Sequence, residues 1–155
     1  MIEEGKKAPA FSLPDQDGKA VTLDSLRGKD VFLYFYPKDD TPGCTKEACG
    51  LRDRWKDLQK KGVVVLGVSA DDAASHRKFI AKYKLNFPLL TDADRSVMKA
   101  YGAYGKKMMY GVEKIGVIRS SVWIGPHGLV KKHWKKVADA AKHPEQVWEL
   151  VAGTR

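Results

Sequence analysis

Two cysteines stand close together in the run from Pro37 to Cys49. Cys44 follows Thr41 and Pro42, a pair that matches a helix N-cap and the proline favoured at the first helical position. Cys44 is then the third residue of the helix, and Cys49 lies five residues further on. The partial positive charge and unpaired N–H groups of a helix start favour a thiolate over a thiol. This pattern therefore predicts a reactive cysteine at position 44 and thiol-based redox chemistry.

The cysteine pair has other interpretations. A structural disulfide would need an oxidising compartment, and nothing in the sequence points to one. A dithiol exchange enzyme is expected to carry C-x-x-C, whereas four residues separate these cysteines. Cys49 by itself could be a buried inert cysteine. A structural zinc site needs about four ligands, and the cysteines show no finger-like spacing to any of the four histidines, His76, His127, His133 and His143.

Two further residues are candidates for the site. Thr41 could be only a helix cap, or its hydroxyl could also orient a substrate oxygen near the Cys44 sulfur. Arg119 is the only charged residue between Val117 and Ile124. It could lie on an exposed strand face, or its guanidinium could stabilise the thiolate and the negative charge that develops on a substrate.

The elements around the cysteines follow from hydrophobic patterning. The apolar run from Val31 to Tyr36 predicts a buried central strand, which Pro37 ends. The helix that follows should place an apolar stripe against the core, made of Cys44, Ala48, Leu51, Trp55 and Leu58. Cys49 lies off this stripe and is expected near solvent.

The rest of the chain alternates strands and helices. Before the central strand, the sequence predicts an N-terminal hairpin (11–23). After the cysteine helix it predicts, in order, a strand (63–68), a helix (from Asp71-Asp72 to about 83), a short strand (87–90), a helix (95–101), a loop (101–116), a hairpin (117–124 and 129–137) and a helix that begins at 144. This order predicts an α/β sheet covered on both faces, in one domain over residues 1–155.

Composition limits the class of protein. The chain has 155 residues, and its 28 basic against 19 acidic residues give a net charge of +9. The lysines are scattered in small pairs, which is typical of a solvated surface, so we expect no nucleic-acid partner, although the charge could steer acidic proteins. No stretch approaches the roughly 20 apolar residues that span a bilayer, and no signal peptide is evident. We expect a cytoplasmic protein without a membrane partner.

The sequence resembles the peroxiredoxin family, and more narrowly the bacterioferritin comigratory protein or peroxiredoxin Q group. The specific part of the match is Pro37-x-x-x-Thr41-x-x-Cys44 with a second cysteine five residues on. The resemblance extends over almost the whole chain, through Ala8-Pro-Ala-Phe11, Tyr34-Phe-Tyr-Pro37, Gly67-Val-Ser69, Phe87-Pro-Leu-Leu90, Tyr101-Gly and Ile118-Arg119-Ser120.

The resemblance implies a thioredoxin-like fold with an N-terminal β-hairpin and a central mixed sheet flanked by helices. It also implies a peroxidase that uses no cofactor and no metal. Cys44 would be the peroxidatic cysteine and Cys49 the resolving one, joined by an intramolecular disulfide. Thr41 and Arg119 would activate the site and Pro37 would shield it. Hydroperoxides would be the substrates and thioredoxin the reductant, and we expect a monomer or a weak dimer.

Two other classes of function remain open at this point: a thioredoxin-like disulfide exchange protein or thiol-dependent chaperone, and a basic binding module with incidental cysteines. The peroxidase hypothesis carries a geometric consequence. Residues five apart on a helix have Cα atoms roughly 8–9 Å apart, and a disulfide needs about 7 Å or less. The first turns must therefore unwind, and Gly43 and Gly50 lower helix propensity on either side of the cysteines.

Overall fold

The computed structural model describes residues 2–153. In chain order the elements are β1 (Ser12–Pro14), β2 (Ala20–Thr22), a 3-10 turn η1 (Asp24–Leu26), β3 (Asp30–Phe35), α1 (Pro42–Lys60), β4 (Val63–Ser69), α2 (Ala73–Tyr83), β5 (Leu89–Thr91), α3 (Ser96–Ala100), β6 (Tyr104–Met109), β7 (Val112–Val117), β8 (Ser120–Ile124), β9 (Val130–Trp134) and α4 (His143–Ala152).

The central sheet has five strands in the order β5-β4-β3-β8-β9. The first three strands run parallel, and β8 and β9 are antiparallel to their neighbours. Strand β3 lies in the middle, with Phe32 opposite Val65 of β4 on one side and Trp123 of β8 on the other. Residues 31–35 of β3 are all buried, which confirms the predicted central strand.

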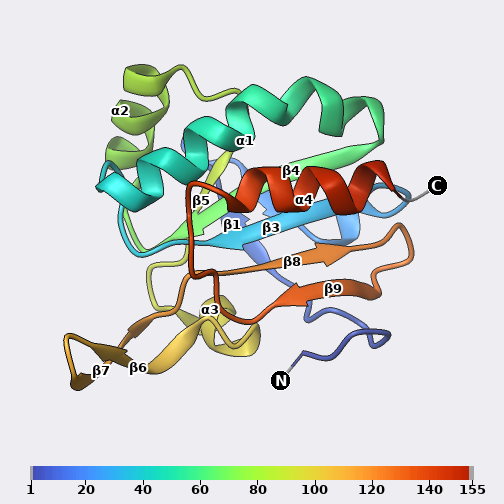
Figure 1. Cartoon of the computed structure of the whole chain (residues 1–155). Helices are drawn as coiled ribbons and strands as arrows, with labels where there is room; N and C mark the ends of the chain where they lie inside the picture. Colours follow the sequence, from blue (N-terminus) through green and yellow to red (C-terminus); the bar gives the residue numbers. More distant parts are fainter. Residues whose placement is uncertain (1, 154–155) are drawn as a thin grey trace.

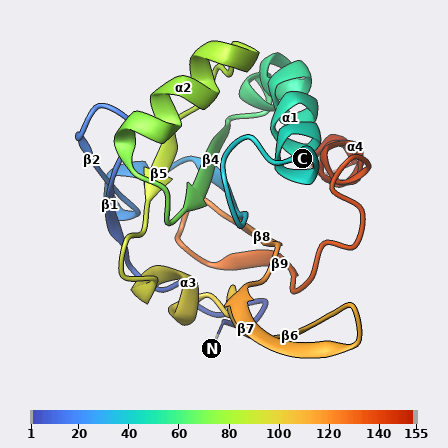
Figure 2. The same cartoon turned by 90° about the vertical axis from the view of Figure 1, so that its left-hand side faces the viewer.

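Two cores form because successive side chains of β3 point to opposite faces of the sheet. Phe32, Tyr34 and Tyr36 pack into one core with residues of α1 and α4. Leu33 and Phe35 pack into the other core, beneath α3 and the β1–β2 hairpin. Figures 1 and 2 show α1, α2 and α4 on one side of the sheet and α3 on the other. The predicted α/β sheet covered on both faces is therefore confirmed.

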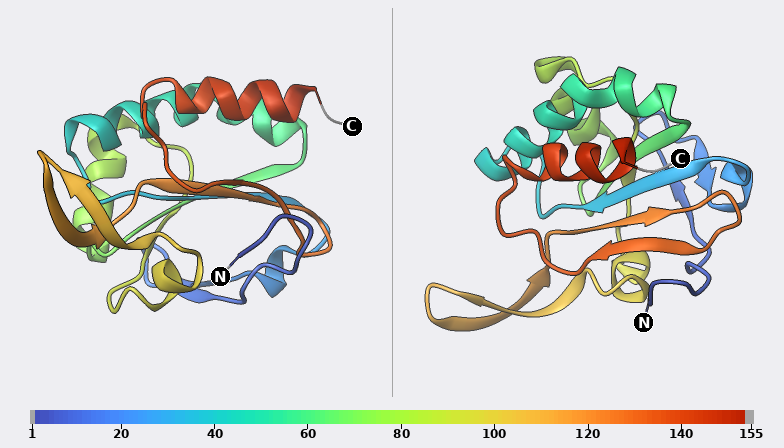
Figure 3. Two further views of the ribbon diagram at one scale, coloured as in Figure 1. Left: turned by 60° about the horizontal axis from the view of Figure 1, so that its bottom comes forward. Right: turned by 45° about the vertical axis from the view of Figure 1, so that its right-hand side comes forward.

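Residues 101–116 differ from the prediction of a loop, because most of them form the β6–β7 hairpin. This hairpin is a separate two-stranded antiparallel sheet, and it projects away from the rest of the molecule (Figure 3). The prediction was wrong because lysine and glycine, which are frequent in this stretch, are depleted in strands. The turn also lacks the Asn-Gly or Asp-Gly pair that usually marks a hairpin. Over residues 2–153, the structure contains no helix that is both long and apolar enough to span a bilayer.

Candidate active site

Cys44 is the third residue of α1, as predicted, because the helix begins at Pro42. Thr41 occupies the N-cap position in an extended conformation, with φ −95° and ψ 156°. Its hydroxyl makes no capping hydrogen bond and instead donates to the carbonyl oxygen of Lys38, at 2.9 Å. The first N–H groups of a helix have no partner within the helix. They therefore leave donors and a partial positive charge beside the Cys44 sulfur.

Arg119 contacts the Cys44 sulfur directly, since its Nη2 lies 3.2 Å from Sγ. The sequence predicted an arginine within a strand from Val117 to Ile124. The structure corrects this: β7 ends at Val117, β8 begins at Ser120, and Arg119 lies in the short connection between them. This connection is held in place, because the Arg119 carbonyl oxygen accepts a hydrogen bond from the N–H of Val137 at 2.8 Å. The guanidinium is therefore delivered to the thiol from 75 residues away in the chain.

Glu47 completes the cluster, and sequence analysis missed it. Its Oε1 accepts a hydrogen bond from Arg119 Nη1 at 2.8 Å, and its side chain is fully buried. Burial raises the pKa of this carboxyl from 4.5 to about 7, although the Arg119 cation acts in the opposite direction. The signal in the sequence was a glutamate three residues after Cys44, which places it on the same face of the helix.

Arg119 therefore bridges two acceptors, the Cys44 sulfur and the Glu47 carboxyl. Charge-assisted hydrogen bonds of this kind are roughly twice as strong as neutral ones, and the planar fork of arginine allows both at once. Cys44 is only 1% exposed. The arrangement holds one buried sulfur next to a cation and the start of a helix.

Cys49 lies in different surroundings. It is half-buried, and both cysteines are free thiols on one continuous helix. With α1 intact, helix geometry keeps their Cα atoms roughly 8–9 Å apart. The structure does not bring Cys44 and Cys49 together.

Gly50 supports a tight contact between α1 and α4. A Cβ added at this position would lie 2.6 Å from Cγ of Pro144, which no real Cβ tolerates. Glycine is required here for the close approach of the second helix. Glycine also lowers the helix propensity at this position. Alanine cannot replace Gly50, because its methyl group would clash with Pro144.

The loop from Pro37 to Thr41 is anchored by buried polar contacts. Oδ2 of Asp39 lies 2.7 Å from His76 Nδ1, and both side chains are almost completely buried. The N–H of Asp39 donates to a carboxylate oxygen of Asp71 at 2.8 Å. These contacts hold the segment that leads into the first turn of α1.

Pro37 is exposed and lies at a groove of about 550 Å³ that reaches Arg119. The groove is lined by Pro37, Lys106, Lys107, Met108, Glu113, Val117, Ile118, Arg119, Lys135, Lys136 and Val137. Its wall is mostly apolar with several lysines. The groove therefore reaches the arginine that contacts the Cys44 sulfur, while Cys44 itself is not part of its lining. Among residues 2–153, no group of three or more His, Cys, Asp or Glu side chains is placed to hold a metal ion.

Comparison with known proteins gives a consistent result. Residues 4–133 match the AhpC/TSA family. A protein from Coxiella burnetii named putative peroxiredoxin bcp is 51% identical over 136 residues, which cover 88% of this chain and 90% of that protein. A Helicobacter pylori protein with the same name is 45% identical over 148 residues, covering 96% of this chain and 97% of that protein.

Solved structures show the same relationship. The bacterioferritin comigratory protein of Xanthomonas campestris superimposes with a TM-score of 0.89 at 34% identity, over 97% of this chain and 98% of that one. Peroxiredoxin Q of Xylella fastidiosa, solved as a cysteine-to-serine mutant, gives a TM-score of 0.91 at 31% identity, over 99% and 97% of the two chains. The fold is therefore that of the thioredoxin-like peroxiredoxins. The chain belongs to the AhpC/TSA family, as a peroxiredoxin of the bcp/Q group and hence a thiol peroxidase.

Proposed function

We propose that this peroxidase reduces hydrogen peroxide and organic hydroperoxides through Cys44, with Cys49 as the resolving cysteine and thioredoxin or a similar dithiol as the reductant. The observation that carries the proposal is the 3.2 Å contact between Arg119 Nη2 and the Cys44 sulfur at the start of α1. An alkyl peroxide reduction activity is described for the X. campestris protein. The mostly apolar groove beside Arg119 would also accept the organic part of such a substrate.

In the first step the Cys44 thiolate attacks the near oxygen of the hydroperoxide. An S–O bond forms and the O–O bond breaks, and the leaving oxygen takes a proton to become water or an alcohol. Cys44 becomes a sulfenic acid, oxidised by two electrons. The helix N–H groups and the Arg119 guanidinium stabilise the charge on the leaving oxygen.

The residues before α1 position the substrate. The Thr41 hydroxyl donates to Lys38, so its oxygen lone pairs remain available to accept the hydrogen bond of a hydroperoxide O–H. Pro37 lies at the groove beside Arg119, and we propose that it shields the reacting sulfur from water. No cofactor enters this cycle.

In the second step the Cys49 thiol condenses with the Cys44 sulfenic acid. An S–S bond forms and one water leaves, so no further oxidant is needed. Because α1 holds the two cysteines too far apart, the first turns must unwind before this bond can form. An external dithiol then reduces the disulfide, restoring both thiols and becoming a disulfide itself. A cytoplasmic location would fit this cycle, since the reductant must be kept reduced.

The test is stopped-flow oxidation of the reduced protein by stoichiometric hydrogen peroxide and by an alkyl hydroperoxide, followed by mass spectrometry of the product. We expect thiol loss far faster than for free cysteine, and a Cys44–Cys49 disulfide within one chain. A coupled assay with thioredoxin and its reductase then checks turnover. Thiol loss no faster than for free cysteine would favour a disulfide exchange protein or chaperone.

A further inference from the structure

The β6–β7 hairpin exposes apolar side chains that the fold does not use. Tyr110 is 98% exposed, and Met108, Val112 and Ile115 are each more than half exposed. The hairpin forms its own sheet and projects from the molecule (Figure 3). Four large apolar side chains gathered on one small element are unusual on a soluble surface and indicate an interaction site.

The turn of this hairpin adds an independent observation. Tyr110 and Gly111 both have positive φ, 52° and 76°, as a two-residue type I′ turn requires. Asn, Asp and Gly suit such a position, whereas a bulky aromatic residue in the left-handed region is an outlier. Turn chemistry therefore disfavours Tyr110, and packing within the described chain does not explain it.

The charge around the hairpin is predominantly positive. Lys106, Lys107 and Lys114 lie on its two strands, with one acidic residue, Glu113, whose carboxylate is 3.8 Å from Lys106 Nζ. The facing wall of the groove adds Lys135 and Lys136. By the register of the hairpin, Met108 and Ile115 lie on one face with Lys106 and Glu113, and Val112 lies on the other face with Lys107 and Lys114. Each face therefore carries both apolar and basic side chains.

The hairpin and Arg119 line one groove. Lys106, Lys107, Met108 and Glu113 of the hairpin line the same groove as Arg119. Arg119 in turn contacts the Cys44 sulfur. A partner bound to the hairpin would therefore lie against the entrance to the site.

We propose that the β6–β7 hairpin is the docking surface for the dithiol protein that reduces the oxidised enzyme, a partner with an apolar face and an acidic rim. The inference rests on the proposed function. A partner held at this groove lies next to Arg119, whose guanidinium contacts the cysteine at the start of α1. A thiolate of the bound partner then attacks one sulfur of the Cys44–Cys49 disulfide, which releases the other as a thiolate. The partner's second thiolate then attacks the partner's own sulfur in the mixed disulfide. This forms a disulfide within the partner and releases the remaining enzyme sulfur as a thiolate, so two electrons pass to the enzyme.

The experiment compares two reductants on the same variants. Thioredoxin is the protein reductant, and dithiothreitol is a small dithiol that needs no docking surface. The readout is the ratio of kcat/KM for thioredoxin to kcat/KM for dithiothreitol. Tyr110→Asn removes the aromatic ring while supplying the residue that a type I′ turn favours, so the hairpin is kept. We expect this ratio to fall about tenfold, as for an aromatic anchor at an interface.

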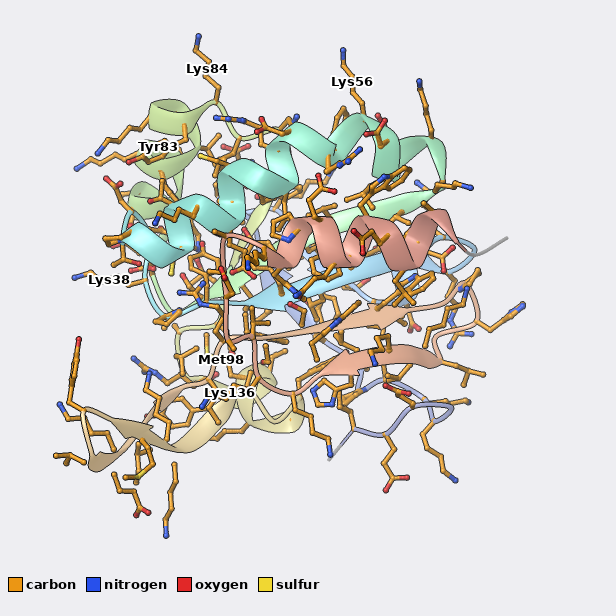
Figure 4. All side chains as sticks on the ribbon, in the orientation of Figure 1. Lys38, Lys56, Tyr83, Lys84, Met98 and Lys136 are labelled. Atoms are coloured by element: carbon orange, nitrogen blue, oxygen red, sulfur yellow. The ribbon has the colours of Figure 1, made fainter. Side chains whose placement is uncertain are left out.

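Lys114→Gln tests the basic part of the surface. We expect about a threefold fall in the same ratio at low salt, and less at high salt, because a charge at the rim of an interface acts mainly on the association rate. Lys56→Gln is the matched control. Figure 4 shows Lys56 projecting from the helical side of the molecule, opposite the hairpin, and we expect no change in the ratio.

The following results would contradict the proposal. A ratio unchanged in Tyr110→Asn and Lys114→Gln, with a wild type that thioredoxin does recycle, would overturn the docking surface and leave the proposed function intact. A wild type that neither thioredoxin nor dithiothreitol recycles would overturn both. An unchanged ratio with loss of a wild-type dimer in Tyr110→Asn would assign the hairpin to self-association. An unchanged ratio with loss of binding to phosphatidylglycerol vesicles would assign it to a lipid surface.

Discussion

The two thiols of α1 are five residues apart and differ in their burial and in the residues around them. The Cys44 sulfur is buried, accepts a hydrogen bond from Arg119 and lies at the start of the helix. Around Cys49, the sulfur is half-buried, and the adjacent Gly50 is packed against Pro144 of α4. The first environment is organised for reaction with a small molecule. The second holds the helix in place and offers the thiol no charged partner that the structure records.

This difference indicates where the helix can open. The Thr41 side chain does not cap α1, so one of the bonds that usually holds a helix start is missing. After Gly50, in contrast, α1 is held by the Pro144 contact and by the hydrogen bond of 2.7 Å from Arg52 Nη1 to the Tyr83 carbonyl oxygen. We infer that unwinding of α1 during the proposed cycle is confined to the segment before Gly50.

The largest expected effect comes from Cys44→Ser, which removes the proposed nucleophile. Peroxide reduction should fall to the level of free cysteine, because Cys49 lacks the Arg119 contact. The fold should persist, since the change is nearly isosteric. The measurement is stopped-flow thiol oxidation together with circular dichroism, and substantial activity in this variant would locate the nucleophile elsewhere.

Cys49→Ser should separate the two steps. It should reduce one equivalent of peroxide as quickly as the wild type and then stall when thioredoxin is the sole reductant. The sulfenic acid on Cys44 should then be trapped by a dimedone-type reagent and seen as an adduct by mass spectrometry. Full turnover with thioredoxin would show that Cys49 is not the resolving cysteine.

Arg119→Ala tests the contact that distinguishes the first thiol from the second. Loss of one preorganised donor to a developing negative charge slows a reaction by about 10²–10³-fold. We expect a slowing of this order for the peroxide step, and a smaller one for Arg119→Lys, which keeps the charge without the planar fork. Arg27→Ala, a change at an exposed arginine beside Asp24, is the control. A wild-type rate in Arg119→Ala would contradict the role.

Glu47→Gln tests the electrostatic cost of the buried cluster. Below about pH 4.5 this carboxyl is protonated in both the folded and the unfolded chain. As the pH rises from 4.5 to about 7, the unfolded chain releases the proton and the folded chain keeps it, so stability falls through this window. The difference between the two pKa values corresponds to about 3 kcal/mol.

Glutamine cannot ionise and can still accept a hydrogen bond from Arg119. Relative to wild type, Glu47→Gln should therefore gain stability as the pH rises from about 5 to about 8, by up to about 3 kcal/mol. The measurement is the free energy of unfolding from urea titrations at several pH values. A constant difference between the two proteins across this range would show that Glu47 does not titrate there.

The smallest effect concerns the segment that we expect to unwind. Gly50→Ala would raise the helix propensity of this segment, but a methyl group at this position would clash with Pro144. Thr45→Ala raises helix propensity by about 0.6 kcal/mol, so we expect roughly threefold slower disulfide formation with an unchanged first step. Amide exchange should also be faster in oxidised than in reduced protein over residues 41–49, and unchanged after residue 50. Equal exchange over 41–49 in both redox states would contradict the unwinding.

Some of the fold could be predicted from the sequence and some could not. The buried strand at 31–35, the helix that begins at Pro42 and the last helix near Pro144 carry strong local signals, and the structure confirms them. The β6–β7 hairpin was missed because its turn contains Tyr110 where turn chemistry favours asparagine. The prediction of one domain over residues 1–155, like the roles of Thr41 and Pro37, stays a prediction.

The sequence by itself determined the position of Cys44 at the start of a helix and the family resemblance. Both depend on residues that are close together in the chain, where turn, cap and helix preferences act. Only the tertiary structure decided the rest of the cluster. Arg119 reaches Cys44 because β8 pairs beside β3 in the sheet, and the pKa of Glu47 is raised because packing of these layers buries its carboxyl. Contacts between distant segments and the loss of solvent around them arise when the layers pack, so no local pattern could reveal them.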